Sequence, residues 1–224
     1  MQQIVPGVHT FTGLLMGRVY LLQDEDALTL VDAGLKGVGG RILRQISDAG
    51  HSPADVRCIL ITHAHPDHVG SLQVVQQATG AEVWCHPLEK PVIEGDVPIP
   101  RPPSSLRFPS QKADHVTVSR TFVQDETLPV LGGLQVIETP GHAPGHVSFW
   151  HPERRLMIVG DVIFYLFNRM TLPLAMATVD MDENRRSVQK LASFQPDIML
   201  FGHGQPIVGG AAAHLAAFMQ RLGL

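Results

Sequence analysis

Thr62-His63-Ala64-His65-Pro66-Asp67-His68 follows directly on the apolar run Cys58–Ile61. The pattern predicts a buried strand from whose carboxyl end four metal-competent side chains emerge. Residues two apart on an extended backbone point the same way, so the first two histidines can bind one ion. The Asp-His pair, which turns toward the next helix, can face a second ion. Imidazole and carboxylate together favour zinc, iron or manganese over calcium.

Three further apolar strands end in the same manner. They are Leu134–Glu138 followed by Thr139-Pro140-Gly141-His142, Leu156–Val159 followed by Gly160-Asp161, and Ile198–Phe201 followed by Gly202-His203. In open α/β sheets the functional crevice lies outside the carboxyl ends of the strands, so these segments converge if the strands are neighbours. Any one of these histidines alone would be better interpreted as a core or surface residue. The whole set favours a metal site.

The remaining patterns predict an α/β protein. Further strands are expected at Ile4–Phe11, Val19–Gln23, Leu28–Val31, Val56–Ile61, Ala81–Cys85, His115–Val118, Thr121–Val123 and Val147–Trp150, and helices at Gly39–Ala49, Val69–Thr79, Glu183–Ser193 and Ala211–Leu222. Two halves of this kind suggest two sheets packed face to face with helices outside. With 224 residues, 44% of them hydrophobic, and no linker, we expect a single domain spanning residues 1–224.

Proline sets one long segment apart. Between about residues 87 and 112 six prolines are expected to interrupt every helix and central strand, namely Pro91, Pro98, Pro100, Pro102, Pro103 and Pro109. Long irregular excursions of this kind are usually functional, so we expect a substrate loop here.

Composition excludes several classes. A formal net charge of −4 and the lack of a Lys/Arg-rich run argue against nucleic acid as a partner. The chain shows neither an export-signal pattern nor an apolar run of roughly 20 residues, so we expect a cytoplasmic protein that does not cross a membrane. Cys58 and Cys85 lie in apolar strand-like runs and are expected as reduced, buried thiols, although a disulfide stays open.

The motifs Thr-His-Ala-His-Pro-Asp-His, Pro-Gly-His, Gly-Asp and Gly-His-Gly, in this order and across nearly the whole chain, resemble the metallo-β-lactamase superfamily, with its glyoxalase II and lactonase-like metallo-hydrolases. The resemblance implies a four-layer αβ/βα sandwich with two divalent metal ions at one edge of the sheets. Zinc is the first choice, and iron and manganese stay open. The implied ligands are His63, His65 and His142 for the first metal and Asp67, His68 and His203 for the second, with Asp161 bridging both.

Four other residues are weaker candidates. In the resembled family an acid at Asp32 orients a ligand histidine, the alternative being an ordinary turn residue. His146 is either a supporting or substrate-facing group or a plain packing histidine. The apolar run Ile163–Met176 could form the wall of a hydrophobic pocket, or pack in the core or against a second subunit in a homodimer. Within it, Tyr165 and Asn168 are candidates to polarise a substrate carbonyl.

The leading hypothesis is a dinuclear metal-dependent hydrolase that cleaves an ester, lactone or thioester of a small molecule with an apolar acyl part. A metal-bridging hydroxide would attack, with Asp67 or Asp161 managing the proton. True metallo-β-lactamases tend to carry Cys or Ser at the position of Asp161, and flavodiiron-like relatives Glu in place of His65, so both classes are disfavoured.

Two alternatives stay open. One is an oxidoreductase resembling persulfide dioxygenases, with a single iron held by His63, His142 and Asp161. The other is a glyoxalase II-like thioesterase, although the full-length kind continues into a helical glutathione-binding domain. A metal-binding protein without activity is disfavoured, because a structural zinc site usually closes with four ligands and does not need seven.

Overall fold

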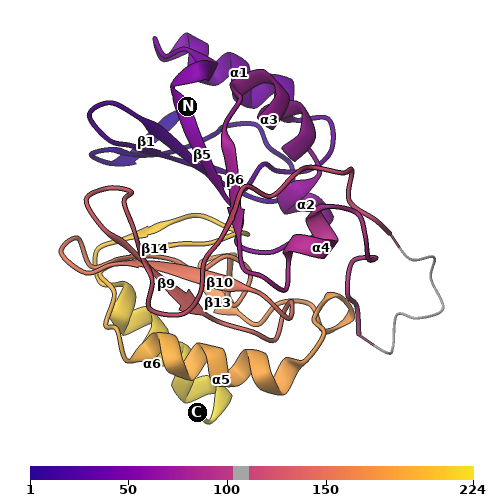
Figure 1. Cartoon of the computed structure of the whole chain (residues 1–224). Helices are drawn as coiled ribbons and strands as arrows, with labels where there is room; N and C mark the ends of the chain where they lie inside the picture. Colours follow the sequence, from indigo (N-terminus) through magenta and orange to yellow (C-terminus); the bar gives the residue numbers. More distant parts are fainter. Residues whose placement is uncertain (103–110) are drawn as a thin grey trace. The chain divides into compact units, whose positions relative to one another are not determined.

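The computed structural model describes residues 1–102 and 111–224, which fall into two compact units (Figure 1). The N-terminal unit comprises Met1–Ile99 together with later segments that end at Phe122 and Gly132. Among the described residues, the C-terminal unit comprises residues 100–102, Val123–Leu128 and Gly133–Leu224. Each unit is a sheet with helices on one face, as the sequence predicted for each half.

Seven described strands form the sheet of the N-terminal unit, in the order of the chain. They are β1 (Gln2–Val5), β2 (Val8–Thr10), β3 (Tyr20–Gln23), β4 (Leu28–Val31), β5 (Val56–Leu60), β6 (Glu82–Cys85) and β7 (Arg120–Thr121). β1 to β4 form an antiparallel meander, and β4 to β7 pair in parallel. Parallel pairing brings the carboxyl ends of β4 and β5 together, which positions the residues that follow them.

The helical segments of this unit are α1 (Gly39–Asp48), η1 (Pro53–Asp55), α2 (Pro66–Val69), α3 (Leu72–Thr79) and α4 (Lys90–Ile93). Figure 1 shows α1 and α3 along the same face of the sheet. The buried residues of α1, Ile42 and Ile46, are one helical turn apart and join a core with Val75 of α3 and Ile59 of β5. Burial of this apolar face, rather than helix propensity, stabilises α1.

The described strands of the C-terminal unit form a second sheet in the order β15-β14-β11-β10-β9-β8 and a separate hairpin, β12-β13. Their bounds are β8 (Thr127–Leu128), β9 (Leu134–Glu138), β10 (Val147–His151), β11 (Leu156–Ile158), β12 (Phe164–Leu166), β13 (Arg169–Thr171), β14 (Ile198–Leu200) and β15 (Ile207–Val208). β11 and β14 pair in parallel, and the other neighbours are antiparallel.

Two long helices cover one face of this second sheet, α5 (Met181–Ala192) and α6 (Ala211–Leu222), and a short turn, η3 (Ala175–Ala177), precedes them (Figure 1). Val188 and Leu191 of α5 pack with Leu215 and Phe218 of α6 in one buried cluster. The side chain of Asp180 accepts the backbone N–H of Glu183 at 2.9 Å and caps the start of α5.

Most sequence predictions of elements are confirmed within one to three residues, including all four predicted helices. The single strand predicted at Ile4–Phe11 is instead the antiparallel pair β1 and β2, separated by Pro6 and Gly7. The strand predicted at His115–Val118 is wrong, and the next predicted strand is shortened to β7. The N–H of Val116 bonds to the carbonyl of Ile93 at 3.3 Å, and the N–H of Val118 to the Glu94 side chain at 3.0 Å. This extended segment therefore bonds to the end of α4 instead of to a strand.

The Pro-rich excursion also needs a correction. Pro91 does not prevent a helix, because it lies in the first turn of α4, where a missing N–H costs no intrahelical bond. Pro98, Pro100 and Pro102 lie in described segments without helix or strand, in line with the prediction. Pro103 and Pro109 lie outside the described residues.

The apolar run Ile163–Met176 contains a hairpin that the sequence did not indicate. Phe167 and Asn168 join β12 to β13 with φ of 51° and 59°, the left-handed pair typical of a two-residue hairpin turn. Ile163 and Met170 are buried in the core of the unit, whereas Phe167 is 97% exposed. Part of the run therefore packs in the core and part of it faces outward.

In the part of the chain that the structure describes, every helix is too short or too polar to cross a bilayer.

Both cysteines are free and buried, as the sequence suggested. Burial raises the pKa of the Cys58 thiol and raises that of Cys85 to about 12, with Glu82 and Glu89 respectively adding to the effect. We therefore expect the folded chain to resist a disulfide-exchange reagent at about pH 8, where an exposed thiol reacts readily. Colorimetric thiol counting checks this, with the urea-unfolded chain as the control that reacts at both cysteines. Rapid labelling of the folded protein would contradict the prediction.

Candidate metal centre

The first group of candidate ligands lies where β5 ends in the N-terminal unit. Pro66 starts α2 and restricts the residue before it to extended backbone, and His65 has φ −81° and ψ 157°. The ring centroids of His63 and His65 are 4.6 Å apart, and those of His63 and His68 are 4.1 Å apart. Nε2 of His68 lies 3.9 Å from Oδ2 of Asp67. The four predicted ligands of this unit thus form one cluster.

Asp32 positions two of these histidines. It follows β4 directly, and its N–H bonds to the carbonyl of Leu60 at 2.8 Å, which places its side chain beside Thr62. Its carboxylate accepts bonds from the Thr62 N–H and the Thr62 hydroxyl, both at 2.8 Å, and lies 2.7 Å from Nδ1 of His68. The Thr62 hydroxyl also lies 3.1 Å from Nδ1 of His63. Because its one hydrogen is donated to Asp32, the hydroxyl accepts a hydrogen bond from Nδ1 of His63.

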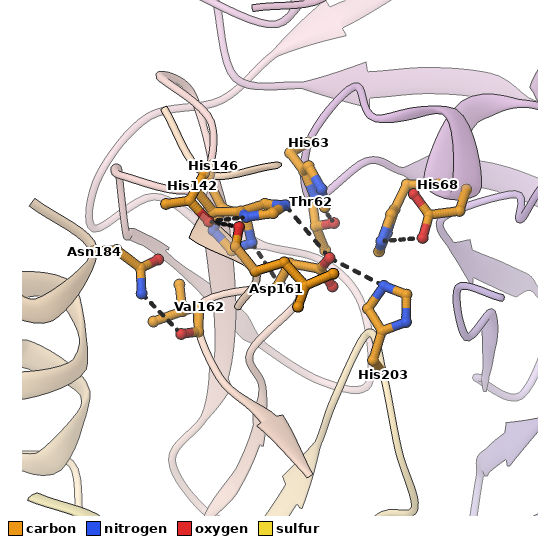
Figure 2. A network of polar contacts seen from close by, with 12 residues as sticks. Thr62, His63, His68, His142, His146, Asp161, Val162, Asn184 and His203 are labelled. Carbon is orange, nitrogen blue, oxygen red and sulfur yellow. Dashed lines mark hydrogen bonds and ion pairs between the residues drawn. The ribbon is translucent and has the colours of Figure 1, made fainter. Parts of the chain in front are cut away.

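The hydrogen-bond pattern therefore assigns the same tautomer to His63 and His68. In each ring Nδ1 carries a proton, so Nε2 is the nitrogen that could bind a metal. Figure 2 shows Thr62 beside His63 and the position of His68.

Glu89 is a supporting residue that the sequence analysis missed. Its carboxylate accepts the N–H of Ala64, between His63 and His65, at 2.8 Å, and its side chain is buried. Glu89 is the residue before α4, in the excursion from which only irregular structure was expected. Proline is common in the first turn of a helix, so the sequence Glu89-Lys90-Pro91 was the local signal that could have indicated a helix beginning after Glu89.

The second group lies in the C-terminal unit. β11 and β14 are parallel neighbours, the N–H of Gly202 bonds to the carbonyl of Gly160 at 2.8 Å, and Asp161 and His203 follow at matching positions. Nε2 of His203 lies 3.2 Å from Oδ2 of Asp161, and Nε2 of His142 lies 3.4 Å from the same oxygen (Figure 2). One buried carboxylate oxygen is thus shared by two imidazoles.

The tautomer of His142 is set in a similar way. Its Nδ1 lies 3.1 Å from the hydroxyl of Thr178, and that hydroxyl donates to the carbonyl of Leu174 at 3.0 Å. Nδ1 therefore carries a proton, and Nε2 is the ring nitrogen that faces the carboxylate of Asp161. A ring nitrogen and a carboxylate oxygen this close need a proton or a metal ion between them, so this donor set suits a divalent metal ion.

His146 supports the backbone of Asp161. Its Nε2 accepts the N–H of Asp161 at 2.9 Å, so its proton is on Nδ1, which lies 2.9 Å from the hydroxyl of Thr139. The Thr139 hydroxyl is 3.0 Å from that of Ser148, which donates to the carbonyl of Val159 at 3.3 Å. Because Nε2 accepts a hydrogen bond, the ring of His146 carries its proton on Nδ1 alone in this arrangement.

The two candidate substrate residues lie on the hairpin. The ring of Tyr165 stacks on Phe201 with centroids 5.5 Å apart and meets His214 edge-on at 6.0 Å. Its backbone N–H bonds to the carbonyl of His203 at 2.9 Å, so Tyr165 fixes the turn that carries this ligand. Asn168 lies at the hairpin turn.

The family model described as "Metallo-beta-lactamase superfamily" matches residues 12–203. The chain belongs to the metallo-β-lactamase superfamily. It is 29% identical to the probable metallo-hydrolase YflN of Bacillus subtilis, over 91% of this chain and 86% of that protein. It is also 29% identical to the hydroxyacylglutathione hydrolase GloC of Haemophilus influenzae, over 63% of each chain.

Solved structures show the same fold. A metallo-β-lactamase family protein of Thermus thermophilus superposes with a TM-score of 0.76 at 22% identity, over 99% of this chain and 81% of that one. A mutant metallo-β-lactamase from Cronobacter sakazakii gives 0.75 at 25% identity, over 100% and 97%. The predicted fold class, the α/β sandwich of the metallo-β-lactamase fold, is confirmed, and membership in this metallo-hydrolase superfamily implies divalent metal ions.

Asp32→Ala is expected to weaken metal binding, measured with Zn²⁺ as the probe, about 10- to 100-fold, because His68 and Thr62 lose the acceptor that orients them. Competition with a chromophoric chelator measures the change. Asp114→Ala is the matched control, since this carboxylate pairs with Lys36 on the surface at 2.7 Å and contacts no candidate ligand. Equal zinc affinity in both variants would contradict the assigned role of Asp32.

Proposed function

We propose that the chain is a dinuclear metal-dependent hydrolase that cleaves an ester, lactone or thioester bond of a small molecule with an apolar acyl part. The observation that carries the proposal is Oδ2 of Asp161, which lies 3.4 Å from Nε2 of His142 and 3.2 Å from Nε2 of His203. In the ligand sets implied by the family, these two histidines serve different metals. A carboxylate oxygen shared between them suits a bridging ligand.

In this proposal the two units act as a single domain that spans residues 1–224, and each unit supplies part of each ligand set. The first metal would be held by His63, His65 and His142 and the second by Asp67, His68 and His203, with Asp161 bridging. Two divalent ions and two carboxylates leave a net charge of +2, which favours a carbonyl oxygen and a developing oxyanion. Zinc is the proposed metal. When bound, such ions polarise carbonyls and lower the pKa of water toward about 7.

Asp67 and Asp161 are the proposed groups for proton handling. The side chain of Asp67 is 15% exposed, whereas that of Asp161 is 3% exposed and its backbone is fixed by His146. This difference favours Asp67 for exchanging a proton with solvent and Asp161 for holding a fixed position.

Exposed apolar residues in and after the β12-β13 hairpin support the proposal that the protein recognises an apolar acyl group of its substrate. Phe167, Leu174 and Met176 are 97%, 62% and 64% exposed. Phe167 also adopts a left-handed backbone, φ 51°, which is unusual for a bulky residue. Several large exposed apolar side chains on one short segment are typical of a contact site. The competing proposal, a homodimer contact, predicts a dimer in analytical ultracentrifugation that Phe167→Ser dissociates.

A narrower form of this proposal is a glyoxalase II-like thioesterase, since one relative bears the name hydroxyacylglutathione hydrolase. The alternative from a different class is the mononuclear iron oxidoreductase. The free, buried state of Cys58 and Cys85 fits a reducing compartment, and we propose the cytoplasm.

Full removal of metal is expected to abolish hydrolysis of a panel of lactones, esters and thioesters, and two equivalents of Zn²⁺ per chain should restore it. Elemental analysis together with rates on the panel checks this. One iron per chain with thiol-dependent oxygen uptake would favour the dioxygenase instead.

Asp161→Ala is expected to lose most activity and at least one metal, because the bridging carboxylate is gone. His115→Ala, whose Nδ1 contacts the carbonyl of Glu94, should keep both. The same loss in both variants would mean that the site has been placed wrongly.

Phe167→Ser is expected to raise KM for long-chain acyl substrates roughly 10-fold, about the value of one lost apolar contact, and to leave short-chain substrates unchanged. Val208→Ser, at a residue 54% exposed on β15, is the control. A uniform change across chain lengths would argue against an acyl contact at the hairpin.

A further inference from the structure

The first half of α5 lies against the turn that carries His142. The N–H of Asp180 bonds to the carbonyl of Gly141 at 2.9 Å, and the N–H of Val179 to the carbonyl of His142 at 3.2 Å. The hydroxyl of Ser187 donates to the carbonyl of Pro140 at 2.7 Å. Three consecutive carbonyls of the ligand turn are therefore held from α5 and the residues just before it.

The closest approach is at Asn184. A Cβ atom on Gly141 would lie 2.2 Å from the backbone nitrogen of Asn184 and 2.5 Å from its Cα, and Gly141 has φ 128°. Only glycine fits between the ligand turn and the helix, so the backbone of α5 sets the position of the residue next to His142.

The side chain of the same residue reaches the second ligand turn. Asn184 is completely buried, and its Nδ2 donates to the carbonyl of Val162 at 3.0 Å (Figure 2). Val162 follows Asp161 directly. One residue thus contacts both the neighbour of His142 and the neighbour of Asp161.

Stability of the helix does not explain an asparagine here. The buried face of α5 consists of Asn184, Ser187, Val188 and Leu191. An apolar residue at 184 would continue this face, and Asn is a weaker helix former than Leu or Ala. Within the described part of the chain, its buried Oδ1 has no hydrogen-bond partner, which costs free energy that leucine would avoid. What asparagine offers and leucine lacks is the bond to Val162.

We propose that Asn184 is a positioning residue that fixes Asp161 relative to His142, and thereby sets the separation of 3.4 Å between Oδ2 and Nε2 on which metal affinity depends. The inference rests on the proposed metal-dependent function. A buried residue of α5, and not a residue adjacent to the ligands in the sequence, would then affect the metal affinity of the site.

The test compares the full-length wild type with Asn184→Leu, which keeps a similar volume, and Asn184→Ala, which avoids any clash if leucine does not fit. The expected result is zinc affinity about 10- to 100-fold weaker in both variants by chelator competition. The Tm of metal-free Asn184→Leu should be unchanged or higher, and the visible spectrum of the Co²⁺-loaded variants should differ from wild type.

Thr79→Val is the matched control, because it removes a buried hydroxyl bond to a backbone carbonyl, that of Val75 at 2.8 Å, in a helix without ligands. It should bind zinc like wild type. Wild-type affinity and Co²⁺ spectra in both Asn184 variants would overturn the inference, whatever their Tm. A wild type that binds no zinc, iron or manganese would instead overturn the proposed function.

Discussion

The geometry of the candidate ligands in the N-terminal unit depends on the hydrogen bonds of the Asp32 carboxylate. The side chain of Asp32 is 3% exposed, and a buried carboxylate of this kind is tolerated only when it is well hydrogen-bonded. Thr62 and His68 supply those bonds, and Thr62 extends the network to His63. Asp32 and Thr62 lie close together because β4 and β5 pair in parallel and their carboxyl ends lie side by side. The fold therefore orients two imidazoles before any metal binds.

The C-terminal unit orients its ligands with neutral groups instead. His142 donates to a threonine hydroxyl, and the backbone of Asp161 is held by an uncharged His146. The difference has an electrostatic reason. Asp161 already contributes a buried carboxylate between two imidazoles, and a second buried carboxylate nearby would compete for the same cations. In the N-terminal unit the acid that orients the histidines can be charged, since Asp67 is only partly buried.

The features that the sequence predicts correctly are those formed by residues close together along the chain. Ligand residues just past apolar strands are visible locally, and so are the helices, because their signals lie within a dozen residues. Thr178, Glu89 and Asn184 act on ligand segments 22 to 36 residues away, and their roles depend on tertiary approach that no local pattern encodes. The hairpin was missed for a different reason, since its turn uses Phe-Asn at positive φ where glycine is the usual signal.

Asn184 and Phe167 of the C-terminal unit both depart from the residue preferences that favour stability, and both lie on segments that contact proposed ligand turns. Asn184 lies on the buried face of α5, where leucine would favour helix stability. Phe167 exposes a large apolar side chain and has a left-handed backbone conformation. A sequence selected for stability alone would place leucine in the helix and a glycine or asparagine at the turn. The first exception holds the residue after Asp161, and the second lies on the hairpin whose base fixes His203. Both departures from local preference therefore lie on segments that contact a proposed ligand turn.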